Sequence, residues 1–183
     1  PPLQITPTLG MLVTGMQADA RAIVQTARAE AARWAHAYGY PASADHLARF
    51  LADRAQVYTQ HAYMRPLGVV PLVAGIDEEL GPQLFKVDPA GHTAGYRGAG
   101  AGAKDMEVEA HLEKAFRSPS SSGALSPDAT IQAALGALTA VLGEDFKASE
   151  VEVGVVRGDE GRRFRVLTEA EVDGHLVALA ERD

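Results

Sequence analysis

The apolar residues change their period along the first part of the chain, and each period predicts an element. Residues 8–16 form a short apolar run that ends at a glycine turn, which predicts a buried strand. From Asp19 to Tyr38 the apolar residues recur every three or four positions, which predicts an amphipathic helix. Gly39 then follows as a C-cap, because glycine adopts without strain the left-handed conformation that ends many helices.

A second helix and an antiparallel meander of strands are predicted next. Ser43 has the side chain of an N-cap, and this helix has to end by Pro66, because the residue before a proline is pushed out of the α region. The short connection between the two helices predicts an antiparallel pair that forms one layer. The predicted strands are residues 67–76, 83–87 and 92–97. The first of them is almost continuously apolar, which predicts burial on both faces, and Pro71 within it predicts a bulge or an unpaired position.

The C-terminal part of the chain again alternates helices with strands. The predicted elements are helices at 103–116 and 127–142, strands at 150–156 and 164–166, and a helix from 168 to the end. Thr168 and Glu171 form the capping-box pattern at the start of that last helix. Residues 118–127 are rich in Ser and Pro, which predicts a flexible loop. The order of elements predicts an α+β fold with two helical layers and two sheets between them, in a single domain that spans 1–183.

Composition and charge exclude several classes of function. The 183 residues include 17 basic and 24 acidic ones, so the net charge of −7 makes the chain a poor candidate for binding nucleic acid or an anionic membrane. The chain has no cysteine, which excludes a disulfide framework, a thiolate zinc site and a cysteine nucleophile. No apolar run reaches the roughly 18 residues that predict a transmembrane helix, and no signal-peptide pattern is visible.

The candidate chemical groups do not form the pattern of an active site. The six histidines lack an HExxH motif or a close pair, which favours surface or core-edge positions over a metal site. Residues 98–104 (GAGAGAK) look like a phosphate loop but fail its pattern on both sides of the lysine, which favours a tight turn. The acidic residues 77–79 lie in a turn, where solvation is a simpler interpretation than acid–base catalysis. Ser118 and the serines at 120–122 lack the GxSxG elbow of a nucleophile. The sequence therefore predicts no catalytic residue, no metal and no cofactor.

An ordered series of short motifs resembles proteasome α subunits and extends over nearly the whole chain. The central motifs are Arg65-Pro66-Leu67-Gly68, Ala74-Gly75-Ile76-Asp77, Gly81-Pro82-Gln83-Leu84 and Asp88-Pro89-Ala90-Gly91. The ending at 167–183 is similar to that of the eukaryotic iota-type α subunit. Each motif is weak alone, whereas the ordered set is specific to the family.

The resemblance implies a fold, a function and a set of partners. The implied fold is the four-layer α-β-β-α sandwich of the N-terminal-nucleophile hydrolases. The implied function is that of a non-catalytic structural subunit of the 20S proteasome α ring, which supports core-particle assembly, substrate gating and activator docking in ubiquitin-dependent protein degradation. The implied partners are neighbouring α subunits, β-ring subunits and the regulatory particle or other activators, in the cytoplasm and nucleus. The signature residues are expected to act as scaffold: Arg65, Pro66, Gly68, Gly75, Asp77, Gly81, Pro82, Asp88, Pro89 and Gly91.

Two departures from the family pattern carry their own expectations. The family's first strands, ring-packing helix and gating tail have no counterpart before Pro1, so we expect a chain that is partial at its N-terminus, with one sheet incomplete. Gln4 stands where α subunits usually place the lysine that receives the C-terminal carboxylate of an activator tail. Because glutamine supplies no charge, docking in this pocket is expected to be impaired.

Two other functions are compatible with parts of the sequence. A catalytic threonine peptidase of the same fold would need a threonine exposed by cleavage upstream of Pro1, with its own amine as the base. A small nucleotide-binding protein would use residues 98–104. The α-type motifs favour the non-catalytic subunit over both.

Overall fold

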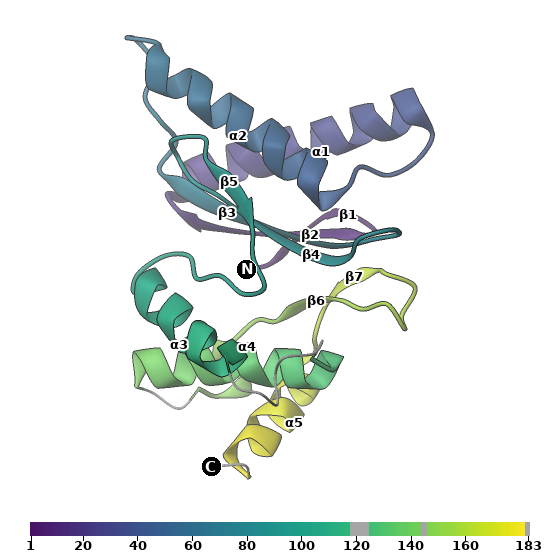
Figure 1. Ribbon diagram of the computed structural model, residues 1–183, viewed down its shortest axis with the longest axis vertical. Coiled ribbons are helices and arrows are strands. Elements are labelled where there is room, and N and C mark those ends of the chain that lie inside the picture. The colour runs from purple at the N-terminus through teal and green to yellow at the C-terminus, as the bar shows by residue number, and fades with distance from the viewer. Residues whose placement is uncertain (118–124, 144–145, 182–183) are drawn as a thin grey trace. The chain divides into compact units, whose positions relative to one another are not determined.

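The computed structural model describes residues 1–117, 125–143 and 146–181, which form two compact units (Figure 1). The first unit comprises Pro1–Arg97 and Gly154–Arg165, and the second comprises Gly98–Val153 and Val166–Asp183. The chain thus leaves the first unit after Arg97, returns to it with Gly154–Arg165 and ends in the second unit. None of the helices in the described ranges combines the length and the hydropathy that crossing a bilayer requires.

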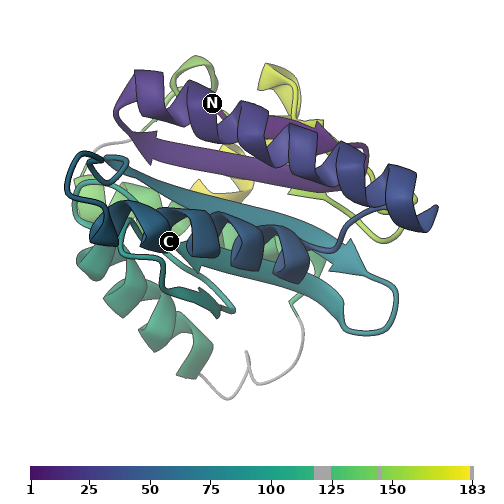
Figure 2. The same cartoon turned by 90° about the horizontal axis from the view of Figure 1, so that it is seen from above.

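The first unit contains the two predicted helices, α1 (Gln17–Tyr38) and α2 (Ala44–Gln60). Gly39 ends α1 in the left-handed conformation, with a φ of 78°, and the Ser43 hydroxyl caps α2 by accepting a hydrogen bond from the His46 N–H. Both predicted caps are therefore confirmed. The two helices lie side by side on one face of the sheet, as a view from above shows (Figure 2).

A five-stranded antiparallel sheet supports these helices. Its strands are β1 (Leu3–Thr6), β2 (Leu9–Gly15), β3 (Val69–Asp77), β4 (Gly81–Val87) and β5 (Thr93–Gly95), in the order β1-β2-β3-β4-β5. The predicted meander of β3, β4 and β5 is confirmed. β1 was not among the predicted strands, because its apolar and polar residues alternate over only four positions, which is a weak pattern.

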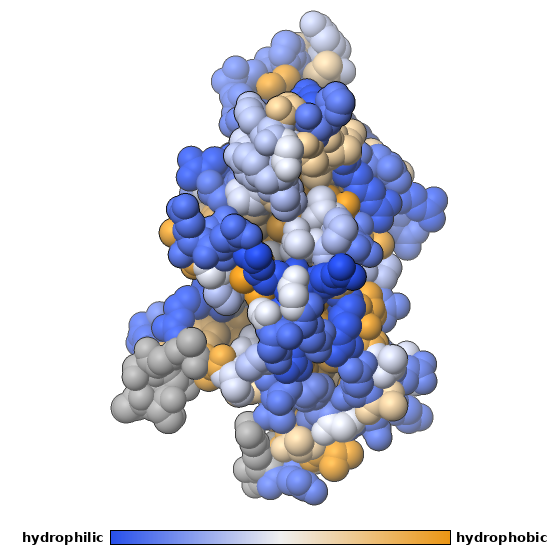
Figure 3. Space-filling model, turned by 90° about the vertical axis from the view of Figure 1, so that its right-hand side faces the viewer, coloured by the Kyte–Doolittle hydropathy of each residue, from blue (hydrophilic) through white to orange (hydrophobic). Residues whose placement is uncertain are grey.

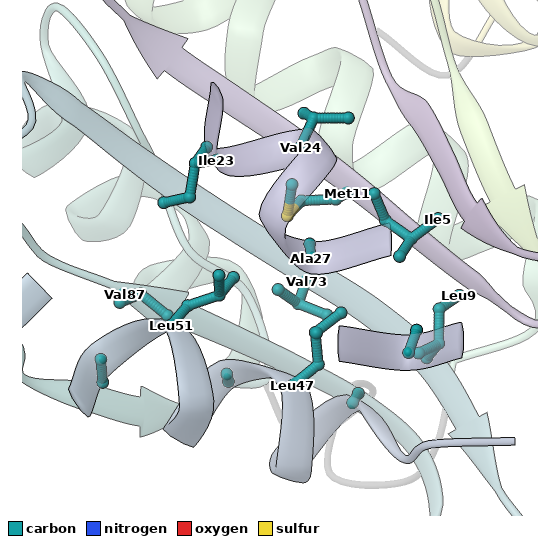
Figure 4. Packing of buried hydrophobic residues seen from close by; sticks show 14 of the residues in the cluster. Ile5, Leu9, Met11, Ile23, Val24, Ala27, Leu47, Leu51, Val73 and Val87 are labelled. Carbon is teal, nitrogen blue, oxygen red and sulfur yellow. The ribbon is translucent and has the colours of Figure 1, made fainter. Parts of the chain in front are cut away.

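The hydrophobic core of the first unit lies between the helices and the sheet (Figure 4). Alternate residues of the strands point into it, since successive side chains of a strand face opposite sides of the sheet. Residues of α1 and α2 spaced three and four apart complete it, as the sequence pattern predicts. The labelled members are Ile5, Leu9, Met11, Ile23, Val24, Ala27, Leu47, Leu51, Val73 and Val87.

Pro71 lies in the central strand β3 without a bulge. It pairs with Val13 of β2, and the register between the two strands continues without a shift. The N–H of Met16 donates to the carbonyl of Gly68, so the backbone of Gly68 faces β2. Along an antiparallel strand every second residue hydrogen-bonds to the same neighbour. Pro71 is three positions after Gly68, so its backbone nitrogen faces away from β2. On the other side the pairing of β3 with β4 begins only at Leu72. The missing donor therefore falls just outside the ladder, so the expected bulge is wrong and the unpaired position is confirmed.

A two-stranded sheet of β6 (Gly154–Val156) and β7 (Phe164–Val166) packs against the large sheet within the first unit. The Phe164 N–H donates to the carbonyl of Pro7. A Cβ at Gly10 would lie 2.2 Å from the Phe164 ring, so only glycine allows this close approach. The strand predicted at 150–156 is shorter than expected, since β6 begins only at Gly154, and the short 3-10 helix η2 (Ala148–Glu150) precedes it.

The second unit is helical. It contains α3 (Asp105–Arg117), α4 (Pro127–Leu142), η2 and α5 (Glu169–Ala180), with contacts between α3 and α4, between α4 and α5, and between α5 and η2. Ser126 caps α4, and Thr168 and Glu171 form the predicted capping box of α5. Of the predicted Ser/Pro loop at 118–127, residues 118–124 lie outside the described residues.

Candidate functional site

The residues that could carry chemistry lie apart from one another. Within the described ranges no group of three or more His, Asp or Glu residues could hold a metal ion. The face drawn in Figure 3 is mostly hydrophilic, and its hydrophobic residues form small separate patches. An apolar cavity of about 90 Å³ lies between α1, α2 and the sheet, and its lining is mainly aliphatic.

The glycine-rich segment at 98–104 packs as a turn. The backbone of Lys104 has a φ of 61°, and its ammonium donates to the carbonyl of Val141 at 3.0 Å. Val141 lies in the last turn of α4, where a cation stabilises the unpaired carbonyls of a helix end. A Cβ at Gly100 would lie 2.7 Å from the carbonyl oxygen of Asp105. Lys104 therefore ties the segment to α4, and the geometry does not favour a nucleotide site.

The acidic turn between β3 and β4 is built around Asp77. Its Oδ1 accepts hydrogen bonds from the N–H groups of Glu79 and Leu80, at 2.9 and 3.0 Å. These two bonds are the main reason that the pKa of Asp77 lies below its ordinary value. Glu78 pairs with Arg162 at 2.7 Å. Two of the three acidic residues of this turn thus have structural partners.

The Arg65 motif is tied to α1 by a buried carboxylate. Asp19 is only 5% exposed, and its two oxygens accept from the Arg65 guanidinium at 2.7 and 2.9 Å. The N–H of Gly68 donates to the same carboxylate at 3.0 Å. The Arg65 hydrogen bonds, with that of Gly68 next in importance, lower the pKa of Asp19 to about 2. Arg65 and Gly68 therefore hold the segment before β3 against the first turn of α1.

The remaining signature residues lie in the strands and turns of the meander. Asp88 Oδ1 accepts from the N–H groups of Ala90 and His92, at 2.9 and 2.8 Å. Gly91 has a φ of 90°, and a Cβ there would lie 2.7 Å from the carbonyl oxygen of Ala52, so this turn requires glycine. Pro66 lies in the loop before β3, Gly75 in β3, and Pro89 in the turn after β4. Gly81 and Pro82 begin β4.

A second buried carboxylate, Glu30, lies on the same face of α1. Glu30 is 6% exposed and bonds to His46 Nε2 of α2 at 2.9 Å and to the guanidinium of Arg33. The His46 ring also packs on Trp34, with ring centroids 4.0 Å apart. The sequence analysis missed both Asp19 and Glu30 as paired groups. Their spacing on the apolar stripe of α1 was the available signal, because a carboxylate on a buried face needs a partner.

Gln4 lies in the edge strand β1, and its side chain is exposed. Its backbone carbonyl accepts two hydrogen bonds from Arg28 of α1, from Nε at 3.1 Å and from Nη2 at 2.9 Å. A positive charge therefore lies beside Gln4, although Gln4 itself carries none.

Next to Arg28 an open groove of about 350 Å³ runs along α1. Its lining comes from the turn between β1 and β2, from α1 and from the connection between α1 and α2: Ile5, Thr6, Pro7, Arg28, Ala31, Ala32, Ala35, Gly39, Tyr40 and Pro41. All of these residues belong to the first unit. α1 contributes three alanines to this lining.

Comparison with known proteins gives a consistent result. The family model described as "Proteasome subunit" matches residues 3–156. The chain is 44% identical to "Probable proteasome subunit alpha type-1" of Schizosaccharomyces pombe over 179 residues. These aligned residues cover 98% of this chain and 72% of the relative. It is 37% identical over 180 residues to "Proteasome subunit alpha type-6" of Caenorhabditis elegans, with the same coverage. The archaeal "Proteasome subunit alpha" of Methanosarcina barkeri is 32% identical over 179 residues, 98% of this chain and 69% of the relative.

Proposed function

This chain belongs to the proteasome subunit family as an α-type subunit of the non-catalytic ring of the 20S core, and on that premise we propose how it serves the particle. It acts as a structural member of the ring, contacts neighbouring α subunits and the β ring, and supports substrate gating and activator docking. The type we propose is the eukaryotic iota type. The proposed compartments are the cytoplasm and nucleus.

One observation carries this proposal. The likeness to α-type subunits extends over 98% of the chain, at 44% identity for the fission yeast relative. The α-type subunits are the non-catalytic members of the protease, so a catalytic threonine peptidase is not the function of this chain. The paired carboxylates of α1 agree with a structural role, since Asp19 and Glu30 are each engaged in ion pairs and hydrogen bonds.

The proposed architecture is the four-layer α-β-β-α sandwich of the family. The antiparallel sheet with α1 and α2 on one face, and the β6–β7 sheet against it, support three of the layers. The helices α3, α4 and α5 would form the fourth. The β6–β7 sheet has only three residues in each strand, and further strands would be needed to make such a sheet stable.

The signature residues have a proposed scaffold role, and Gln4 a proposed role in docking. Arg65 and Gly68 support the scaffold role through their bonds to Asp19, as do Asp77 and Asp88 through the turns that they close. Gln4 would occupy the position of the family lysine that receives activator carboxylates. Its exposed side chain is compatible with that position and supplies no charge.

Co-expression with the other subunits of a 20S particle tests the proposal. The expected result is that native mass spectrometry finds one copy of the chain in each α ring, in a particle whose peptidase activity resides in other subunits. A chain that stays monomeric while the remaining subunits assemble without it would contradict the proposed role. A chain with Asp53→Asn serves as a control, because Asp53 is exposed on α2 and outside the paired network.

A further inference from the structure

The side chain of Met16 lies at the junction between β2 and α1, next to the guanidinium of Arg65. Met16 is the N-cap residue of α1, and its side chain makes no capping hydrogen bond. Its backbone is held on both sides, because its N–H donates to the Gly68 carbonyl and its own carbonyl accepts from Ala20, each at 2.9 Å. The residue is 54% exposed, so small solutes can reach its side chain.

The Arg65 guanidinium directs an N–H group toward the Met16 sulfur. Nη1 donates to Asp19 Oδ2 at 2.7 Å and to the carbonyl of Pro66 at 3.1 Å. Nη2 donates to Asp19 Oδ1 at 2.9 Å, and the Met16 sulfur accepts from the same nitrogen at 4.0 Å. A thioether is a weak acceptor, so the contact with the sulfur is the weakest of these. The guanidinium therefore has a charged donor in place for a better acceptor at this point.

The other three methionines of the chain lack such a donor. Met11 is 1% exposed in the core, whereas Met64 and Met106 are 44% and 73% exposed. Among residues 1–117, 125–143 and 146–181, no group donates a hydrogen bond to the sulfur of any of these three. Met16 thus combines exposure with a charged donor, and Met106 provides a comparison for exposure alone.

Oxidation by hydrogen peroxide supplies the better acceptor. The thioether sulfur donates an electron pair to one peroxide oxygen, and the O–O bond breaks. That oxygen stays on the sulfur as a sulfoxide, and the other leaves as water with both peroxide protons. The sulfur is oxidised and the peroxide is reduced. The product side chain is polar, and dedicated reductases convert it back to the thioether.

The sulfoxide oxygen can reach Arg65 Nη2 without movement of the backbone. The oxygen extends beyond the sulfur, which already lies 4.0 Å from Nη2, and an N–H···O bond needs a separation of about 2.9 Å. The rotatable bonds of the methionine side chain allow this adjustment. A hydrogen bond from a charged donor is stronger than one from a neutral donor. Because Met16 is half exposed, the new polar group is also not forced into the core, as it would be at Met11.

We propose that Met16 is a site of reversible oxidation by peroxide, and that Arg65 holds the sulfoxide product. The modification fastens the start of α1 more tightly to the segment before β3, through the guanidinium that already binds Asp19. Its effect is opposite to the usual one, because methionine sulfoxide ordinarily disrupts the packing around it. The inference goes beyond the proposed function and does not depend on it, since all of these groups lie in the first unit of the chain.

Two variants of the chain that differ in the exposed methionine they retain test this inference. Met64→Leu with Met106→Leu keeps Met16, and Met16→Leu with Met64→Leu keeps Met106. Each is treated with hydrogen peroxide, peptide mapping by mass spectrometry gives the extent of oxidation, and circular dichroism gives the Tm before and after. Oxidation of Met16 is expected to raise the Tm by about 2 °C, as one additional hydrogen bond predicts. Oxidation of Met106 is expected to leave the Tm unchanged or to lower it.

Met11 reports in each sample whether the chain is folded. It is buried in the core, so peroxide oxidises it only where the core opens. A sample in which Met11 stays reduced is therefore a folded one. Incubation with methionine sulfoxide reductases of both epimer specificities should then return the Tm to its value before oxidation.

A second background tests the role of Arg65. Asp19→Asn with Arg65→Gln, added to the variant that keeps Met16, replaces the ion pair by neutral amides, so that no buried charge loses its partner. The rise of the Tm on oxidation should be lost in this background. If these substitutions open the core, as oxidation of Met11 would show, the comparison of Met16 with Met106 decides alone.

Several results would overturn the inference. The Tm could fall or stay constant when Met16 is oxidised, or it could rise equally when Met106 is oxidised or when Arg65 and Asp19 are replaced. A Met16 that stays reduced at a peroxide dose that oxidises Met106 would also overturn it, as would a rise of the Tm that the reductases do not reverse. None of these outcomes affects the proposed function, which the co-expression experiment tests separately.

Discussion

Asp19 and Glu30 interrupt the apolar face of α1, and each is held by cationic or polar partners. A buried carboxylate without a partner would strongly destabilise a fold, so the partners determine whether such a residue is tolerated. For Asp19 the partners are Arg65 and the N–H of Gly68. This arrangement gives a family-signature motif a physical reason, because Arg65 and Gly68 bond to the same carboxylate.

Replacement of Asp19 by Asn should destabilise the chain in a pH-dependent way. The pKa of Asp19 is lowered to about 2 in the fold, from an ordinary value of 3.8. Its ionised form therefore stabilises the fold fully above about pH 4, and this contribution is lost as the pH falls toward 2. Denaturant unfolding of both proteins should show a difference that is largest near neutral pH and shrinks below pH 4. Asp53→Asn is the control, with a stability within about 0.5 kcal/mol of the wild type.

Leu47 is expected to contribute strongly to the core. It is 0% exposed and packs between α2 and the sheet. Leu47→Ala removes buried methyl groups and leaves a cavity, so the free energy of unfolding should fall by about 2–5 kcal/mol. Leu80 lies in the β3–β4 turn and is 72% exposed. Leu80→Ala should therefore change the free energy of unfolding by less than about 0.5 kcal/mol. Equal effects of the two substitutions in chemical denaturation would contradict the placement of this core.

Gln4→Lys tests the proposed docking position. A lysine there would add a charge on the exposed side of β1, and an exposed ion pair contributes up to about 1 kcal/mol. Activator-derived peptides with a free C-terminal carboxylate should therefore bind assembled variant particles a few-fold more tightly, as fluorescence anisotropy would measure. The same peptides with an amidated C-terminus provide the control. A gain that is equal for both forms would indicate a non-specific charge effect.

At the scale of elements, helix caps are the features that local sequence specifies most directly. Ser43 accepts a hydrogen bond from the His46 N–H and so satisfies one of the free donors at the start of α2. Ser43→Ala should lower the free energy of unfolding by about 1 kcal/mol, whereas Ser43→Asp should retain most of it, because aspartate also caps. Thermal unfolding followed by circular dichroism measures both. A loss of equal size in the two variants would mean that Ser43 acts through its size and not through its cap.

The sequence predicted the elements with strong periodicity or clear caps, and it failed where tertiary contacts decide. The limits of α1 and α2 follow from their apolar period and from Gly39 and Ser43, and α4 begins at Pro127, because proline is permitted in the first turn of a helix. β1 has only four residues, and its pairing with β2 could not be read from its own pattern. At η2 the Lys147 N–H donates to the Glu150 carboxylate, and the strand predicted from residue 150 begins only at Gly154.

The candidate site shows the same division between local and long-range information. The turns at Asp77 and Asp88 are closed by hydrogen bonds to residues two to four positions away, and their sequence indicated them. The pairing of Asp19 with Arg65 and the bonds from Arg28 to Gln4 join residues far apart in the chain. Periodicity gives the face on which a residue lies, but it does not give the partner on another element.

At the scale of the whole molecule, the chain is an α-type subunit, which is a non-catalytic member of the particle. Its buried carboxylates are paired within the first unit, and Lys104 is bonded to a helix end in the second. A threonine peptidase needs a threonine whose own amine is free to act as the base. The membership of the α type places that chemistry in other subunits of the particle.

Covalent labelling of the assembled particle can therefore distinguish a scaffold from a catalyst. An electrophilic peptide probe that acylates N-terminal threonines is expected to modify other subunits and to leave this chain unlabelled. The reason is that labelling requires a nucleophile activated by an adjacent amine, within a site that binds the peptide part of the probe. Intact-mass spectrometry of the separated subunits measures the label on each chain. Particle denatured before the probe is added controls for non-specific acylation of lysines, because denaturation destroys the site and keeps the lysines. A stoichiometric label on this chain that competes with substrate would contradict its assignment to the non-catalytic ring.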